Sequence, residues 1–233
     1  MLKVEDELAF VLHWRNFTDS RIIIDFFTQH YGRVSTVFRT RHRKSSGSSK
    51  PQQFVPLSIS YHGKNTLRTL SQIEIEHPPL LHAGESLYCG MYINELIQRL
   101  FAAEDPHPRL FEAYHRCLQQ LSVVEKEVVD VVLREFEFLL LDDLGVGIDF
   151  LQDAQGNSIE ASSEFYYTFS PTQGFTPVVP HSRQLSLRGS QLQAIAEGRW
   201  AAEGARLAAK QVCRVALNEA LGGKPLVSRE LFK

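Results

Sequence analysis

Apolar and polar positions alternate with a short period in the first 75 residues, which predicts β-strands rather than helices. Five apolar runs are separated by turn residues, at 8–14, 22–27, 34–38, 54–62 and 66–74. In the fourth run, Leu57, Ile59 and Tyr61 alternate with polar side chains. Five short strands are typical of a small barrel. The obvious candidate is the oligonucleotide-binding (OB) fold, and an SH3-like barrel has the same strand count.

After Pro78 and Pro79 the apolar spacing becomes helical. Helices are expected from residue 84, from a start signal at 105–108, over 128–144 and from about 200 to 221. The helix over 128–144 is apolar almost all round, so we expect it to be central and buried on most sides. Residues 152–189 are rich in Gly, Ser and Pro and read as a mostly irregular insertion, with a strand at 165–169.

The predicted fold class is therefore α+β with two domains. Residues 1–79 form a five-stranded OB-fold barrel, and residues 80–233 form an all-helical domain with an irregular insertion at about 150–189. A polar, Ser-rich tract at 39–53 cannot pack a core and reads as a long loop of the barrel.

Composition narrows the class of protein. The 233 residues are 43% apolar and 22% charged, which is ordinary for a globular chain and argues against a fibrous or disordered one. The three cysteines are scattered and none lies in a Cys-x-x-Cys pair, which disfavours a disulfide framework and a thiolate zinc site. No apolar run of membrane-spanning length and no secretory signal is evident, so we expect a cytoplasmic protein without a membrane partner.

Charge is distributed unevenly along the chain. Residues 1–84 carry 11 basic and 7 acidic residues, residues 85–170 carry 5 and 16, and residues 171–233 carry 9 and 4. Within the first block, residues 33–68 hold eight basic residues and no acid. A strongly basic region in a chain with a net charge of −2 indicates a polyanionic partner, the alternative being a solvated basic loop.

No catalytic motif is found. The chain has no phosphate-binding P-loop, no Gly-x-Ser-x-Gly elbow and no His-Glu-x-x-His helix. Asp142, Asp143, Asp149 and Asp153 could be imagined as a metal-dependent nuclease site, but a solvated or ion-paired helix end is the simpler interpretation. We therefore predict no enzyme activity, no cofactor and no metal.

Several blocks in order resemble the bacterial RecO family of recombination mediators. They include 9–13 with Arg15, then 26–28, 32–34, 53–57, 67–70, 87–96, 133–137 and 144–147, and the ending LGGKPLVSREL at 221–231. The resemblance implies an OB-fold barrel followed by a helical domain. It also implies binding of single- and double-stranded DNA, annealing of complementary strands, and loading of RecA onto DNA coated with single-strand binding protein (SSB), with RecR as partner.

The family's helical domain is further implied to dock the acidic, Phe-ended tail of SSB. Two features depart from the family. Some members carry a four-cysteine zinc site in the insertion, but residues 147–175 contain no cysteine. Where many members have Lys-Gly-(Ala or Val)-Arg after the third strand, this chain has Arg-Thr-Arg-His-Arg-Lys at 39–44.

Basic residues around the barrel are the candidates for phosphate contacts, because such contacts release counterions and leave base edges free for annealing. These are Arg15, Arg33, Arg39, Arg41, Arg43, Lys44, Lys64 and Arg68. Neighbouring aromatic side chains could stack on bases. For Phe38 and Tyr61 we favour a place in the barrel core, whereas for Trp14 both roles stay open.

For the SSB tail we predict a cradle of Arg134, Lys210 and Arg214. Arg134 interrupts an apolar helix, so it must be paired or aimed at a partner. Helical spacing allows the alternative that it pairs with Asp130 or Glu137. Arg206, Lys210 and Arg214 form one stripe of the last helix. The competing function is an adaptor that binds protein through an SH3-like barrel and does not bind DNA.

Overall fold

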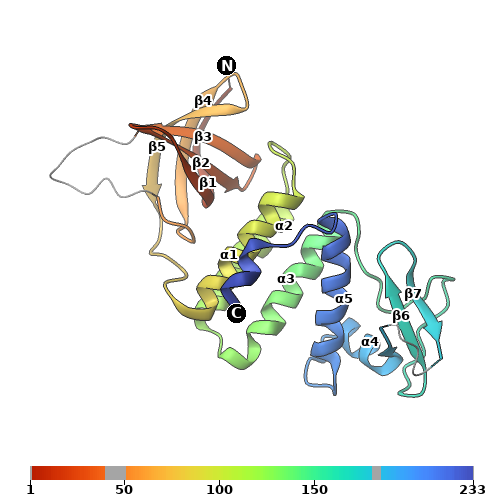
Figure 1. The fold of residues 1–233 in the computed structure, drawn as a ribbon. Helices are drawn as coiled ribbons and strands as arrows, with labels where there is room; N and C mark the ends of the chain where they lie inside the picture. The colour runs from red at the N-terminus through yellow and green to blue at the C-terminus, as the bar shows by residue number, and fades with distance from the viewer. Residues whose placement is uncertain (1, 40–50, 180–184, 233) are drawn as a thin grey trace. The chain divides into compact units, whose positions relative to one another are not determined.

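The computed structural model describes residues 2–39, 51–179 and 185–232 (Figure 1). The chain forms two compact units. The first contains Met1–Val124 together with Leu226–Lys233, and the second contains Glu125–Pro225. Each unit is described on its own below.

The first unit contains a closed five-stranded barrel with the strand order β1-β2-β3-β5-β4. The strands are β1 (Leu2–Thr18), β2 (Arg21–Thr28), β3 (Gly32–Arg39), β4 (Leu57–Gly63) and β5 (Leu67–Ile75). The first half of β1 pairs with β4 and the second half with β2, so one long strand closes the barrel. Only the β3–β5 pair is parallel. The predicted OB-fold is confirmed.

Strand β2 is buried on both faces, which explains its continuous apolar run. Ile22, Ile24 and Phe26 face the barrel core, in which Tyr61 is also buried and against which Phe38 packs. On the other face, Phe27 packs against α2, with its ring centroid 5.3 Å from that of Phe111. The core role favoured for Phe38 and Tyr61 agrees with these positions.

Helices α1 (Gly84–Leu100) and α2 (Pro108–Val123) pack on the barrel and belong to its compact unit. The buried Asn94 amide donates to the carbonyl oxygens of Val11 and Leu12, at 3.3 and 3.2 Å. The Tyr114 hydroxyl donates to the Asn94 Oδ1 atom at 2.7 Å. The compact units therefore divide the chain after residue 124, whereas the sequence predicted a boundary after residue 79. The change of periodicity marks the first helix but carries no information about what that helix packs against.

The last described segment, the 3-10 helix η2 (Val227–Phe232), lies beside α1 (Figure 1). Glu95 of α1 accepts hydrogen bonds from the backbone N–H groups of Val227 and Ser228, at 2.9 and 2.8 Å, and from the Ser228 hydroxyl at 2.6 Å. Burial alone would raise the pKa of Glu95, but the Ser228 and Val227 hydrogen bonds outweigh it and lower that pKa. A carboxylate thus caps the first turn of η2.

The second unit is built around α3 (Val129–Asp143), which follows the 3-10 helix η1 (Lys126–Val128), and α5 (Ala205–Ala220). A small sheet with the order β7-β6-β8 contains β6 (Tyr166–Ser170), β7 (Gly174–Val178) and β8 (Leu187–Arg188). Helix α4 (Gly189–Ala196) follows β8. As predicted, α3 is buried over most of its surface.

Two predictions about this unit were imprecise. The insertion is more ordered than expected, because a hairpin turn at 171–173 brings β7 against β6 and because α4 follows. The last helix begins at Ala205 rather than near residue 200. Its N-cap, Gly204, has a φ of 73°, a left-handed conformation that an α-helix cannot continue through.

Among the described residues, no helix is long and apolar enough to cross a membrane.

Candidate nucleic-acid interface

Two arginines face each other at the end of the β2–β3 pair. Arg21 and Arg39 are direct cross-strand partners, and both side chains are exposed. Directly opposed like charges destabilise a sheet pair, and their Cβ atoms lie roughly 4.5–5.5 Å apart. An anion between the two guanidinium groups would remove this repulsion. This end of the barrel is therefore suited to a phosphate group.

A third arginine of the same region is held by a buried carboxylate. The Arg15 Nη1 atom lies 3.3 Å from the Asp25 Oδ2 atom, and the Arg15 side chain is 56% exposed whereas that of Asp25 is 8% exposed. The Ser35 hydroxyl donates to the other Asp25 oxygen at 2.5 Å. Asp25 thus holds one Nη atom of the Arg15 guanidinium group, while more than half of the Arg15 side chain stays exposed to solvent.

Two other candidates, Arg33 and Arg68, form hydrogen bonds with groups of the protein itself. Arg33 donates through Nη1 to the Phe101 carbonyl oxygen at 2.6 Å, and its burial lowers its pKa, with the Asp25 charge opposing that effect. Arg68 is 8% exposed and donates to Glu104 through Nε and Nη2, at 3.1 and 2.6 Å. Both guanidinium groups tie the barrel to the α1–α2 connection, so neither side chain is presented to a ligand.

The remaining barrel candidates divide into two groups. Lys64 is exposed in the β4–β5 turn. Arg41, Arg43 and Lys44 lie outside the described residues. The sequence does not single out Arg21, because one arginine at the start of a strand belongs to no recognisable pattern. Its candidate role follows only from the strand register, which places it opposite Arg39.

In the second unit, Arg134 has an internal partner. Its Nη2 atom lies 2.5 Å from the Glu137 Oε1 atom, and the two residues are 8% and 0% exposed. The alternative left open by the spacing is therefore the one observed. Burial raises the pKa of the Cys213 thiol, and the Glu137 charge and hydrogen bond raise it further. Arg134, Glu137 and Cys213 thus form a buried polar cluster between α3 and α5.

The basic stripe of α5 is shorter than expected. Arg206 donates to the carbonyl oxygens of Trp200 and Glu127, at 3.2 and 2.5 Å, and pairs with Asp130 at 3.4 Å. Lys210 and Arg214 are exposed, and Leu207, which is 61% exposed, lies one turn before Lys210. The exposed part of the predicted cradle is thus Lys210 and Arg214, and Leu207, which the prediction did not include, lies beside them on the same helix.

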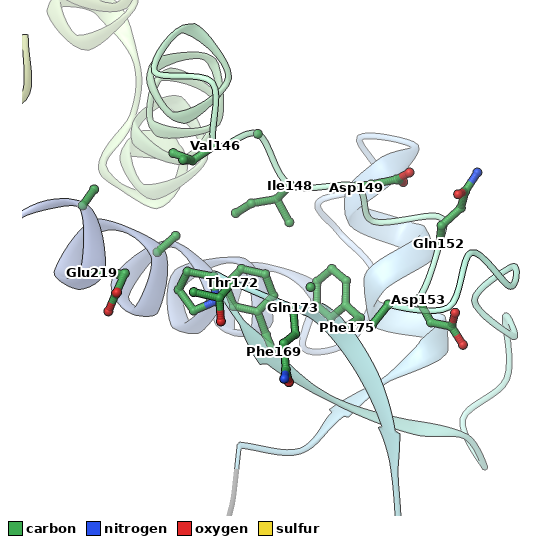
Figure 2. A pocket seen from close by; sticks show the side chains of 16 residues that line it. Val146, Ile148, Asp149, Gln152, Asp153, Phe169, Thr172, Gln173, Phe175 and Glu219 are labelled. Atoms are coloured by element: carbon green, nitrogen blue, oxygen red, sulfur yellow. The ribbon is translucent and has the colours of Figure 1, made fainter.

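The second unit also contains a cavity of about 470 Å³ (Figure 2). Phe169 and Phe175 form part of its wall, carboxylates come from Asp149, Asp153 and Glu219, and none of the described residues that line it is basic. Asp153 accepts the backbone N–H groups of Gln155 and Asn157, each at 2.9 Å, so its carboxylate is used in a turn. In the described part of the chain, no three His, Cys, Asp or Glu side chains are gathered as a metal site would need. The geometry gives no support to the nuclease alternative.

The chain matches two protein-family descriptions that together cover nearly all of it. Residues 1–79 match "Recombination protein O N terminal", and residues 81–230 match "Recombination protein O C terminal". The junction between the two matches falls where the apolar spacing of the sequence changes.

Curated relatives agree with these matches. The chain is 42% identical to the DNA repair protein RecO of Stutzerimonas stutzeri, over 96% of this chain and 92% of the relative. It is 39% identical to the protein of the same name from Aliivibrio fischeri, over 96% and 93%, and 38% identical to that of Pseudomonas aeruginosa, over 97% and 94%. With both domain matches in the order seen in the fold, the chain belongs to the RecO family of DNA repair proteins.

Proposed function

We propose that the barrel binds single- and double-stranded DNA through its phosphates and anneals complementary strands. The observation that carries the proposal is the exposed Arg21–Arg39 pair on an OB-fold barrel of a DNA repair family. The proposed contacts are Arg15, Arg21, Arg39, Arg41, Arg43, Lys44 and Lys64. Arg15 is kept because its side chain is 56% exposed although it pairs with Asp25. Arg33 and Arg68 are left out because their guanidinium groups bind Phe101 and Glu104 and are not presented to a ligand.

Annealing follows from this kind of contact. Two DNA strands repel each other through their phosphates, and Lys and Arg contacts reduce that repulsion by releasing counterions. Contacts to phosphate carry no sequence information and leave base edges available for pairing. A protein that binds only the backbone therefore brings strands together without choosing among them.

A salt titration tests the proposal. Replacing Arg39, Arg41, Arg43 and Lys44 with alanine should weaken binding equally for unrelated DNA sequences. The slope of log affinity against log salt should fall by about 3 units, because each lost phosphate contact removes roughly 0.7–0.9. An unchanged slope would contradict the proposal and would favour the adaptor that does not bind DNA.

We further propose that the protein acts as a mediator that, with RecR, helps load RecA onto SSB-coated DNA in the cytoplasm, without catalysis of its own. The acidic, Phe-ended SSB tail would dock on the second unit. Lys210 and Arg214 would attract its aspartates, and Leu207 offers an apolar contact beside them. Arg134 would have to leave Glu137 to reach the tail's terminal carboxylate, so we assign it a supporting place beneath the site.

The two surfaces can be tested against each other. Replacing Lys210 and Arg214 with alanine should weaken binding of the peptide Asp-Asp-Asp-Ile-Pro-Phe, measured by calorimetry, and should leave the DNA salt slope unchanged. The fourfold barrel variant should do the reverse. Loss of both activities in either variant would mean that the surfaces are not separate.

A further inference from the structure

A neutral groove lies against the barrel in the first unit. It encloses about 390 Å³. Its lining comes from the second half of β1, from the segment before β4, from the segment that leads into α1 and from the first turn of α1. It consists of Trp14, Pro51, Gln52, Gln53, Phe54, Pro79, Leu81, His82 and Leu87. None of these side chains is a carboxylate. The groove therefore combines apolar walls with amide and imidazole groups and does not repel an anion.

The groove is held in one shape. Phe54 has a φ of 63°, a conformation that costs a non-glycine residue about 1–3 kcal/mol. Its carbonyl oxygen accepts the N–H group of Leu80 at 2.8 Å, which joins two walls. A Cβ atom at Gly90 of α1 would lie 2.6 Å from the Leu81 Cδ1 atom and 2.8 Å from the Phe54 Cε1 atom. Close helix packing thus fixes both side chains.

Trp14 presents part of its indole to this groove. The residue packs against the barrel core and is only partly buried. Trp14 pairs with Ile24 of β2, and Arg21 lies three residues before Ile24 on the same strand. At a strand rise of about 3.3 Å per residue, the Cα atoms of Ile24 and Arg21 are roughly 10 Å apart. Residues three apart on a strand point to opposite faces, so the Arg21 side chain leaves β2 on the face opposite to Ile24 and Trp14. A DNA strand whose base enters the groove would therefore bring its phosphates to Arg21 around the end of the barrel.

We propose that this groove binds an unpaired nucleobase of single-stranded DNA, stacked on the Trp14 indole. The inference rests on the proposed DNA binding and adds a site that distinguishes single strands from duplexes. A duplex keeps its bases stacked in pairs, so it can use the arginines but not the groove. Every base has a flat face, so the site tolerates any sequence.

Tryptophan fluorescence provides a direct test, because the chain contains only Trp14 and Trp200. The variant Trp200→Phe leaves Trp14 as the single reporter. Oligothymidine of 12 nucleotides should quench its emission. An abasic oligomer of the same length and charge should bind through phosphates but quench far less. Equal quenching by both oligomers, or DNA binding without quenching, would overturn the base site and leave the proposed DNA binding intact.

Affinity measurements give an independent readout. Trp14→Ala should lower the affinity for oligothymidine roughly tenfold to a hundredfold and leave the affinity for duplex DNA unchanged. Trp14→Phe should retain most of the single-strand affinity. An equal loss for single strands and duplexes would overturn the proposal, because it would indicate a structural role for Trp14.

A variant that leaves the core intact covers the case in which Trp14→Ala fails to fold. Gln52 is exposed in the groove wall, so Gln52→Glu places a carboxylate there without changing packing. It should weaken single-strand binding more than duplex binding, whereas Gln155→Glu, at an exposed site of the second unit, should change neither. Quenching of Trp14 by the acidic SSB-tail peptide and not by oligothymidine would reject the base site and assign the groove to a protein partner. Absence of binding to any DNA would overturn the proposed function itself.

Discussion

The arginines at the end of the β2–β3 pair in the first unit and those beside α3 in the second unit are used in opposite ways. In the barrel, Arg21 and Arg39 face each other in solvent, and Arg15 pairs with Asp25 through one Nη atom while more than half of its side chain stays exposed. In the second unit, Arg134 is buried on Glu137, and Arg206 binds Asp130 and two carbonyl oxygens. An exposed arginine is available to bind a polyanion, whereas a buried arginine is already paired with an acceptor inside the protein. Counting basic residues therefore predicts a binding surface only after the internal partners are subtracted.

The two hollows repeat this contrast. Among the described residues, the groove beside Trp14 is lined by no carboxylate, and the cavity beside Phe169 and Phe175 is lined by three carboxylates and no cation. They differ little in volume, at about 390 and 470 Å³. Charge at the rim, and not size, separates a hollow that admits a nucleotide from one that repels it.

The largest effect is expected from breaking the buried pair. Arg134→Ala would leave the Glu137 charge buried, and loss of one partner of such a pair costs about 3–5 kcal/mol of unfolding free energy. Chemical denaturation of the full chain measures this loss. The double variant Arg134→Met with Glu137→Leu should recover most of it, since an apolar pair needs no desolvation of charge. A loss below about 1 kcal/mol in Arg134→Ala would show that the pair is not essential.

Removing the exposed arginines should have the opposite outcome. Arg21→Ala with Arg39→Ala should lower the DNA salt slope by about 1.5 units. The unfolding free energy should change by less than about 0.5 kcal/mol, because both side chains are exposed. Circular dichroism melts and the salt titration on the same preparation check both statements. A large loss of stability with an unchanged slope would remove the contrast between the two units.

A smaller effect is expected at Glu95, an acid that serves the fold of the barrel unit. Its pKa is lowered in the folded protein, so its contribution is complete above the unfolded pKa of about 4.5. That contribution is lost as the pH falls through the lower folded value. Glu95→Gln should cost about 1 kcal/mol at pH 7 and should lose less stability than the parent below pH 4.5. Parallel pH dependences of the two proteins would contradict this.

Much of the barrel could be predicted from the sequence. The alternation of apolar and polar residues in the fourth run corresponds to β4, whose apolar positions face the core. The continuous apolar run at 22–27 corresponds to β2, which is buried on both faces. The strand predicted at 165–169 corresponds to β6, but its hairpin partner β7 was not anticipated, because a five-residue strand that contains Gly and Pro gives too short a pattern to recognise. The packing of α1 on the barrel also could not be predicted, since the Asn94 contact joins residues more than 80 positions apart.

The candidate site was predicted less completely, for a related reason. Composition identified the basic region, but it could not tell that Arg68 would fold inward onto Glu104 or that Arg21 would stand opposite Arg39. Both outcomes depend on strand register and on contacts with distant parts of the chain. The Arg134–Glu137 pair, in contrast, lies within one helix. Residues three apart on a helix are neighbours, so the sequence alone already offered this pair as an alternative.

The capping of η2 by Glu95 means that the barrel unit is completed by a distant part of the chain. Residues 226–232 return to α1, where the Glu95 carboxylate accepts three hydrogen bonds from Val227 and Ser228. A fragment that ends after α2 would leave this carboxylate without its three donors. The barrel unit is thus discontinuous in sequence, and its native form requires a segment that is synthesised more than 100 residues after α2.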